Sequence, residues 1–425
     1  MTHFGIICPA VTGHLNPMTT LGYELQSRGH RVTVVGILDA EKKAHAAGLD
    51  FKAIAPLDYP YGTMARFSQE LGKLSGLAAL RYTINWIQKL TAILLQQAPQ
   101  VIKTAGIEAL LVDQVSAGGG TVAEYLNIPF ISVSAALMIN EDVSVPPFNT
   151  SWHYNSAWWG KIRNKIGYRL LRQVREPIRA TIAEYRREWN LPPHYYQNDA
   201  YSPLAQLCQQ PAEFEFPRAN LPRCFHFTGT YHNLISRVKV DFPFEKLTGQ
   251  PLIYASMGTL QNRLIEVFET IAQACEKLDA QLVMSLGGGI SQESVPKFSG
   301  SPLVVGNAPQ LELLQKASLT ITHAGLNTAL ESISHGVPMV AIPIANDQPG
   351  VAARIVWTGC GEMVLPKLNV SKLRGAIERV LTQESYRHNT VRLQTANQQA
   401  GGVTKAADII EQVMSTGKPV LAGAN

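Results

Sequence analysis

The sequence His323-Ala-Gly-Leu-Asn-Thr-Ala-Leu-Glu331 lies between two apolar runs, Leu319–Thr322 and Met339–Ile342. This pattern predicts a strand, a tight turn, a helix and a second strand. Free N–H groups and the helix dipole at such a helix N-terminus favour an anion. His323 falls at the end of the strand and Thr328 at the start of the helix, where both side chains can donate to phosphate oxygens. The stretch therefore predicts a diphosphate site.

The same strand–turn–helix pattern recurs on both sides of this stretch. In the N-terminal part the apolar run Phe4–Cys8 precedes a turn in which Asn16 is predicted to cap a helix, with Pro17 in the first helical position. Further strands are predicted at Arg31–Val35 and Leu110–Asp113, and a second series begins after residue 250. Short strands that alternate with helices are typical of parallel, doubly wound α/β sheets.

The length of 425 residues exceeds that of one ordinary core and predicts two domains. The pattern loosens around Pro217–Gln250, where several prolines and mixed charges occur. We therefore expect a first domain over 1–232 with a helical insertion at about 150–190, a second domain over 250–402, and a C-terminal helix and tail over 403–425. The ligand cleft is expected between the two sheets, at their C-terminal edges.

Composition narrows the class of protein. The apolar content of 46% is typical of a globular chain, and no run of about 18 or more apolar residues predicts a membrane-spanning helix. The N-terminus lacks the charged region and cleavage site of a signal peptide. The five cysteines are odd in number and show no Cys-x-x-Cys spacing, which disfavours a disulfide framework or a zinc site. We expect a cytoplasmic protein.

Positive charge is concentrated in one segment. The net charge is +5, but residues 158–187 contain nine Lys/Arg against two Glu, so the remainder is slightly acidic. This distribution argues against a nucleic-acid partner. The wider segment 152–187 also contains three tryptophans. It is interpreted either as a solvated helix face that lines a cleft or as a surface that rests on anionic lipid.

The spacing from Asn307-Ala-Pro-Gln310 to Asp347-Gln348, together with Gly13-His14-Leu-Asn-Pro17, resembles the UDP-glycosyltransferase family. The resemblance covers nearly the whole chain and is to the bacterial branch, which contains antibiotic and carotenoid glycosyltransferases. It implies the GT-B fold, in which two Rossmann-like domains face each other across a cleft. It also implies metal-independent, inverting transfer of a hexose, with UDP-glucose as the expected donor. The absence of Asp-x-Asp from the chain agrees with a site that holds no metal.

The resemblance implies that His14 is the catalytic base and that Asp113 orients it. An unperturbed histidine pKa near neutrality suits this task, and a carboxylate partner would fix the tautomer. Both residues follow strands of one predicted sheet, so they are expected at the same edge. The alternative is that His14 is only a polar residue in the turn at a helix N-terminus.

A donor-binding set is implied in the second domain. The members that match phosphate contacts or the adjacent turns are Ser256, Gly258, Thr259, His323, Gly325, Asn327 and Thr328. Those that match nucleoside and ribose contacts are Asn307, Ala308, Gln310 and Glu331. Those that match contacts to the sugar hydroxyls are Asp347 and Gln348. Two structural alternatives stay open: Thr328 with Glu331 could form a capping box, and Asp347 could cap the helix that follows it.

Two departures from the plant and animal members leave the nucleotide base open. Asn307 stands where those members stack the uracil on a tryptophan, and Gln310 is closer to His323 than in those members. A dTDP-sugar is therefore a second candidate donor. The apolar and aromatic segments 59–97 and 138–160 predict a hydrophobic acceptor with a hydroxyl group, such as a carotenoid, sterol, polyketide or phenolic.

Three other functions compete with glycosyl transfer. The chain could be a sugar-nucleotide epimerase or hydrolase on the same scaffold, or a non-catalytic partner that binds a nucleotide sugar. A dinucleotide-dependent oxidoreductase would also use doubly wound domains, but the glycine fingerprint after the first strand is missing.

Overall fold

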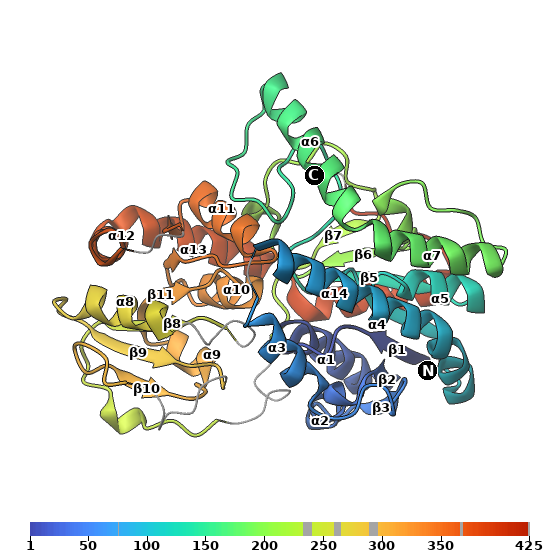
Figure 1. Ribbon diagram of the computed structural model, residues 1–425, viewed down its shortest axis with the longest axis horizontal. Coiled ribbons are helices and arrows are strands. Elements are labelled where there is room, and N and C mark those ends of the chain that lie inside the picture. The colour runs from blue at the N-terminus through green and yellow to red at the C-terminus, as the bar shows by residue number, and fades with distance from the viewer. Residues whose placement is uncertain (75, 233–239, 259–264, 289–295, 366–368, 424–425) are drawn as a thin grey trace.

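The computed structural model describes residues 1–425 except 75, 233–239, 259–264, 289–295, 366–368 and 424–425. Two parallel sheets with helices packed around them lie next to each other (Figure 1). The sequence prediction of two doubly wound α/β units is therefore confirmed.

Within the described ranges the first sheet has seven parallel strands in the order β3-β2-β1-β4-β5-β6-β7. Their bounds are β1 (His3–Ile7), β2 (Arg31–Gly36), β3 (Asp50–Ala53), β4 (Ala109–Asp113), β5 (Phe130–Ser134), β6 (Gln206–Cys208) and β7 (Phe225–Phe227). The second sheet, over the same described ranges, has six strands in the order β10-β9-β8-β11-β12-β13. Their bounds are β8 (Leu252–Ser256), β9 (Gln281–Ser285), β10 (Leu303–Val305), β11 (Ala317–Thr322), β12 (Met339–Ala341) and β13 (Gly361–Met363).

The helices connect and cover these strands. In the first half they are α1 (Thr12–Ser27), α2 (Glu41–Ala46), α3 (Thr63–Leu71), α4 (Gly76–Ala105), α5 (Gly119–Leu126), α6 (Trp158–Val174) and α7 (Glu176–Glu188). In the second half they are α8 (Ile265–Cys275), α9 (Gln310–Leu314), α10 (Leu326–Ser334), α11 (Gln348–Thr358), α12 (Val370–Thr382), α13 (Glu384–Gln399) and α14 (Gly402–Thr416). Short 3-10 turns are η1 (Leu38–Ala40), η2 (Gln197–Ala200), η3 (Ala212–Phe214) and η4 (Phe244–Lys246).

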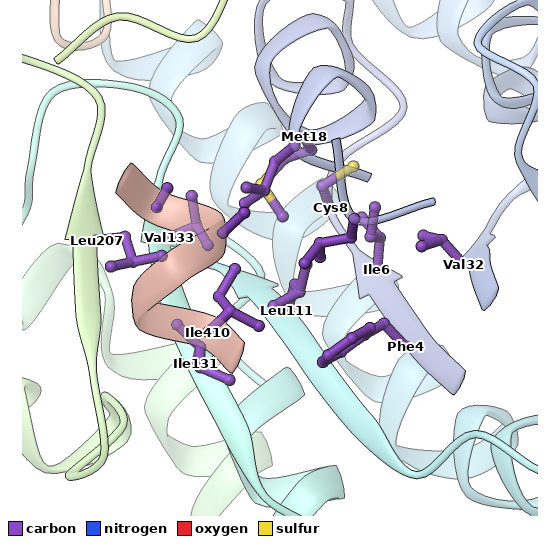
Figure 2. Close-up of a cluster of buried hydrophobic side chains, with 14 of the residues drawn as sticks. Phe4, Ile6, Cys8, Met18, Val32, Leu111, Ile131, Val133, Leu207 and Ile410 are labelled. Atoms are coloured by element: carbon purple, nitrogen blue, oxygen red, sulfur yellow. The ribbon is translucent and has the colours of Figure 1, made fainter. Parts of the chain in front are cut away.

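The last helix returns to the first sheet. Figure 2 shows Ile410 of α14 among core residues of β4, β5 and β6. On the surface, Arg28, the C-cap residue of α1, donates to Asp408 at 2.8 Å and to Glu411 at 2.7 Å. The apolar positions of α14 therefore complete the core of the first domain, although the chain has by then passed through the second.

The start of α1 differs from the sequence prediction. The helix begins at Thr12 rather than after Asn16, with Val11 as N-cap, and Pro17 lies inside it. The prediction that Asn16 caps the helix is therefore wrong. Pro17 cannot donate to the carbonyl of Gly13 four residues earlier, because proline has no N–H. That carbonyl is left available at the edge of the sheet.

Some elements were not predicted. The helix α13 buries Thr390, Leu393 and Asn397, so its inner face carries almost no apolar periodicity. The strands β6, β7 and β13 are three residues each, too short to show a repeat of two. Local sequence patterns are weakest in such elements, because tertiary contacts rather than propensity fix them.

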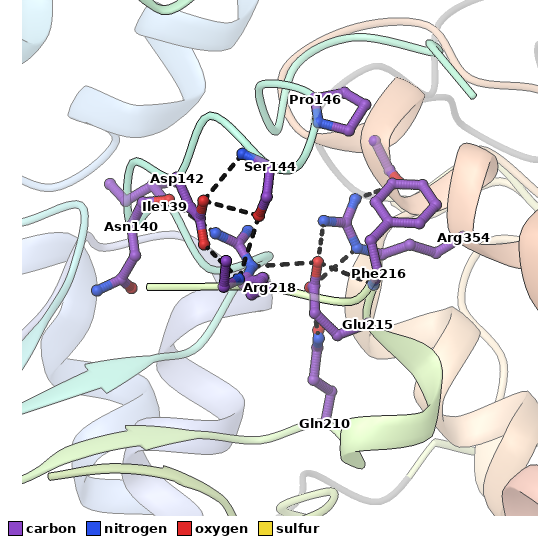
Figure 3. Close-up of polar contacts among 12 residues, drawn as sticks. Ile139, Asn140, Asp142, Ser144, Pro146, Gln210, Glu215, Phe216, Arg218 and Arg354 are labelled. Atoms are coloured by element: carbon purple, nitrogen blue, oxygen red, sulfur yellow. Dashed lines mark hydrogen bonds and ion pairs between the residues drawn. The ribbon is translucent and has the colours of Figure 1, made fainter. Parts of the chain in front are cut away.

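A buried ion cluster joins the two halves (Figure 3). Arg354 of α11 donates through Nε to Glu215 at 3.0 Å and through Nη2 to the second oxygen of that carboxylate. Arg218 pairs with the same carboxylate at 3.3 Å, and Gln210 donates to it at 2.9 Å. Burial raises the pKa of Glu215, but the two guanidinium groups outweigh it and lower the pKa overall. Because an unpaired charge at this depth would be costly, separation of the halves would be opposed by loss of the pair between Arg354 and Glu215.

Candidate active site

His14 and Asp113 meet at the C-terminal edge of the first sheet. The strands β1 and β4 are parallel neighbours, with Ile7 paired to Val112. Asp113 ends β4, and His14 lies in the first turn of α1, which follows β1. His14 Nδ1 is 2.8 Å from Asp113 Oδ2, and the carboxylate is buried. The predicted pairing of these residues is therefore present in the structure.

The surroundings of His14 favour its protonated form. Burial lowers the pKa of His14, but attraction and hydrogen bonding to Asp113, with a contribution from Asp347, outweigh it and raise the pKa. When Nδ1–H donates to Asp113, the lone pair is on Nε2. The arrangement therefore provides a basic nitrogen whose conjugate acid is stabilised by a fixed carboxylate.

His323 occupies a slot between two glycines. It follows β11 directly, and a methyl group on either Gly258 or Gly325 would lie 2.5 Å from its Nε2. Gly258 has φ +76°, a conformation that other residues rarely adopt. Burial lowers the pKa of His323 to about 4, although the Ser256 backbone partly offsets this effect. At neutral pH His323 is therefore an uncharged imidazole that can donate one N–H.

The N-terminus of α10 lies immediately beyond this slot. Gly325 is the N-cap, and no side chain caps the helix, so the capping box considered for Thr328 and Glu331 is wrong. Asn327 and Thr328 are in the first turn, where backbone N–H groups have no partner within the helix. A neutral imidazole beside a helix N-terminus is suited to an anion.

Glu331 of α10 accepts the last hydrogen bond in a series that runs from Tyr254 through Gln310. Gln310, at the start of α9, donates through Nε2 to Glu331 Oε2. The hydroxyl of Tyr254, on β8, donates to Gln310 Oε1 at 3.1 Å. These bonds fix the orientation of two side chains that were assigned from the sequence to the nucleoside and ribose. Tyr254 was not foreseen, because nothing in its sequence context distinguishes it from a core residue.

Asp347 and Gln348 lie where the second domain faces the first. Asp347 is the N-cap residue of α11, but its side chain makes no capping bond. Its Oδ2 accepts instead from the backbone N–H of Leu137 at 3.1 Å, so the capping alternative is wrong. Gln348 accepts from the backbone N–H groups of Ile344 and Ala345, which orders the loop before α11.

Asn327 connects the two domains. Its Nδ2 donates to the carbonyl of Gly13, the group that Pro17 leaves without a helical donor. Its Oδ1 accepts from Gln209 Nε2 at 2.8 Å, and that nitrogen also donates to the carbonyl of Ala135. Gln209 follows β6 and was not singled out from the sequence. Had the helix been predicted to begin before Pro17, the missing N–H of that proline could have pointed to the carbonyl of Gly13.

Ser256, Asn307 and Ala308 are further predicted donor residues that the structure describes. Ser256 ends β8, and its hydroxyl accepts weakly from the Gly258 N–H at 3.4 Å. A methyl group on Gly288 would lie 3.4 Å from the Asn307 side chain. Ala308 packs against a small apolar cluster of the second domain. Thr259 lies outside the described residues.

No group of three or more His, Cys, Asp or Glu side chains within the described part of the chain could hold a metal ion. Across those same residues, no helix has the length and apolarity to cross a membrane.

Comparison of this chain with known proteins assigns a family. The model of the family described as UDP-glucoronosyl and UDP-glucosyl transferase matches residues 63–415. A zeaxanthin glucosyltransferase of Pantoea ananas is 33% identical over 425 residues, which is 100% of this chain and 98% of that protein. A second zeaxanthin glucosyltransferase, of Pseudescherichia vulneris, is 31% identical over 99% of this chain and 100% of that protein.

Solved structures agree on the fold. The glycosyltransferase of kitacinnamycin superposes with a TM-score of 0.75 at 20% identity and covers 97% of this chain and 98% of its own. CalG4, the calicheamicin glycosyltransferase, gives a TM-score of 0.75 at 19% identity, with 99% and 100% covered. These likenesses confirm the GT-B architecture. This chain belongs to the UDP-glucoronosyl and UDP-glucosyl transferase family and is a glycosyltransferase.

Proposed function

We propose that this chain transfers glucose from UDP-glucose to a hydroxyl group of a hydrophobic small molecule, with inversion at the anomeric carbon. A carotenoid with a terminal hydroxyl is the acceptor that we favour. Two zeaxanthin glucosyltransferases that are similar over the full length support this choice. The apolar segments 59–97 and 138–160 of the first domain supply surfaces for such a molecule.

The proposed reaction begins at His14. Its Nε2 removes the proton from the acceptor hydroxyl while the oxygen attacks the anomeric carbon, and the bond from that carbon to the diphosphate oxygen breaks. The proton stays on the imidazole, whose positive charge Asp113 stabilises. One displacement of this kind inverts the configuration. The 2.8 Å contact between His14 and Asp113 is the observation that carries the proposal.

The second domain would stabilise the leaving group. The diphosphate would accept from the first turn of α10 and from neutral His323, so negative charge that develops on it meets donors already in place. A neutral donor suits this position because it does not compete with His14 for a proton.

The sugar would lie between His14 and the groups that bind the diphosphate. Asp347, which contributes to the raised pKa of His14 from the opposite domain, would lie at the end of the donor site nearest the base. Asp347 and Gln348 would accept from or donate to sugar hydroxyls, and Glu331, held by Gln310, would accept from the ribose. The order ribose, diphosphate and sugar would then lead from α9 to His14.

The proposed setting of this reaction is the cytoplasm. All five cysteines are free and buried, which suits a reducing compartment. The segment 152–187 gives the enzyme a candidate contact with the membrane in which an apolar acceptor would be dissolved.

The test is incubation of the purified chain with zeaxanthin in detergent micelles and either UDP-glucose or dTDP-glucose, followed by mass spectrometry of the product. The proposal expects a mass gain of one hexose with UDP-glucose, and a β-glucoside by NMR of the anomeric proton. Release of free glucose without an acceptor product would favour a hydrolase instead. Retention of the α-configuration would contradict the single displacement.

A further inference from the structure

The helix α6 exposes the residues that a surface helix normally buries. Its buried positions are Gly160, Asn164 and Tyr168, which recur every four residues. Five large apolar side chains on another face are between 50% and 73% exposed: Trp158, Trp159, Ile162, Ile166 and Leu170. A surface helix of a globular protein has the opposite arrangement. In Figure 1 α6 stands out from the body of the molecule.

The buried face of α6 is fixed by specific contacts rather than by apolar packing alone. Asn164 Nδ2 donates to the carbonyl of Val143 at 3.0 Å. A methyl group on Gly160 would lie 2.5 Å from the Asn155 carbonyl, and one on Gly167 would lie 2.9 Å from Pro147. Two glycines and an amide therefore set which face points inward. The exposed apolar stripe is a consequence of this fixed orientation and does not arise from loose attachment.

A row of positive charge runs beside the apolar stripe. The helix contains five Lys/Arg and no Asp or Glu. Arg163 lies over the Trp152 ring, and Arg172 pairs with Glu141 at 3.4 Å. Lys161, Lys165 and Arg169 are exposed, and within the described residues they form no ion pair. At 100° per residue these three lie next to the stripe that contains Ile162, Ile166 and Leu170.

We propose that this face of α6 docks on the surface of a bilayer that contains anionic lipid. Apolar side chains and tryptophans would enter the boundary between headgroups and acyl chains, while the lysines and Arg169 would contact lipid phosphates. The positive charge of α6 favours an anionic bilayer over a second copy of the chain. A second copy of the chain would place two rows of positive charge against each other, whereas an anionic surface complements them.

The position of α6 suggests how docking on lipid would help the enzyme reach its acceptor. The anchoring residues Val143, Pro147 and Asn155 lie in the connection between β5 and α6. In the same connection the N–H of Leu137 donates to Asp347. Docking would therefore hold the acceptor side of the site beside the membrane in which an apolar alcohol is dissolved. This use rests on the proposed function, whereas lipid binding by α6 does not.

Vesicle flotation of the purified full-length chain tests the proposal without reference to activity. Phosphatidylcholine vesicles are compared with vesicles that also contain phosphatidylglycerol. We expect flotation with the anionic vesicles, weakened by salt, and little with the neutral ones. The triple variant Lys161→Gln/Lys165→Gln/Arg169→Gln should bind anionic vesicles roughly 10²-fold more weakly, about fivefold for each charge removed. The variant Ile162→Ser/Ile166→Ser/Leu170→Ser should lose binding as well.

A matched control removes the same charge elsewhere. The variant Lys277→Gln/Lys316→Gln/Lys372→Gln changes three exposed lysines of the second domain and should float like the wild type. Equal loss in the control, or flotation that is indifferent to anionic lipid, would overturn the proposal. It would also be overturned if sedimentation showed a dimer that the Ile162/Ile166/Leu170 variant makes monomeric.

Activity separates this proposal from the proposed function. Both α6 variants should glucosylate a water-soluble phenol at the wild-type rate and lose turnover only of acceptor embedded in vesicles. If the wild type floats but transfers no sugar, the lipid contact stands and the proposed function fails. If it transfers sugar but does not float, the lipid contact fails alone.

Discussion

The two sheet edges that form the candidate site each present a histidine, and the surroundings of the two histidines differ. His14 lies against the buried carboxylate of Asp113, which raises its pKa despite burial. His323 is equally enclosed, but Gly258 and Gly325 flank it, and burial lowers its pKa to about 4. An imidazole therefore accepts a proton readily at one edge, as His14, and stays neutral at the other, as His323. Local charge and packing decide its task.

The largest expected effect follows from removal of the base. His14→Ala should lower the turnover number by about 10²- to 10⁴-fold, the usual contribution of general base catalysis. The affinity for UDP-glucose, measured by calorimetry, should stay unchanged, because the proposed donor site is in the second domain. The exposed His388→Ala serves as the matched control and should turn over like the wild type. Turnover of His14→Ala at the wild-type rate would assign the base elsewhere.

The next effect concerns the slot around His323. Gly325→Ala keeps an ordinary backbone φ of −63° but places a methyl group 2.5 Å from the imidazole. The displaced ring should lose the proposed bond to the diphosphate, and donor affinity should fall roughly 10- to 100-fold, the range for one charge-assisted hydrogen bond. Gly375→Ala is the control, since its methyl meets only the flexible end of Arg379. Equal donor affinity in the two variants would show that the position of His323 between the two glycines does not matter for donor binding.

The carboxylate beside His14 should control the pH dependence. The base must be neutral to act, so kcat/KM falls as pH drops through the pKa of His14. Asp113 stabilises the imidazolium and raises that pKa, so Asp113→Asn should move the acid limb of the profile to lower pH and also reduce the maximum rate. The measurement is kcat/KM with a water-soluble phenol across the neutral range. An acid limb that stays in place would show that Asp113 does not set the pKa.

The smallest expected effect concerns the hydrogen bond from Asn327 to the carbonyl of Gly13, which joins the two sheet edges. Pro17→Ala restores an N–H that would compete with Asn327 for the carbonyl of Gly13. We expect kcat/KM to fall roughly two- to tenfold, the size of one net hydrogen bond. Thermal stability should not fall, because proline inside a helix is itself unfavourable. If Asn327→Ala lowers kcat/KM and Pro17→Ala does not, the competition for Gly13 is not the cause.

Much of this comparison could be predicted from the sequence. The apolar runs before His14, Asp113 and His323 each predicted a strand, and parallel strands place the residues that follow them at one edge. This reasoning placed His14 and Asp113 at one edge although they are 99 positions apart, whereas their pairing was implied by the family resemblance. The glycines around His323 were likewise visible, but their contact with the imidazole required the register of β8 and β11.

Other parts depend on contacts that local patterns do not encode. Pro17 suggested a helix start, although it lies inside α1 and frees the Gly13 carbonyl. The apolar spacing of α14 predicted a helix but could not tell that its partner is the first sheet. Gln209 follows a three-residue strand that has no periodicity of its own. Each of these depends on packing between segments that are distant in the chain.

The most direct test of the contrast between the two histidines is a ¹⁵N NMR titration of histidine-labelled protein from roughly pH 8 to pH 5. The His14→Gln and His323→Gln variants would assign the two rings. We predict that His14 titrates with a pKa above the ordinary value of about 6.5 and that His323 stays neutral over the whole range. A His14 pKa below that value, or protonation of His323 near neutrality, would contradict the division of tasks between the two domains.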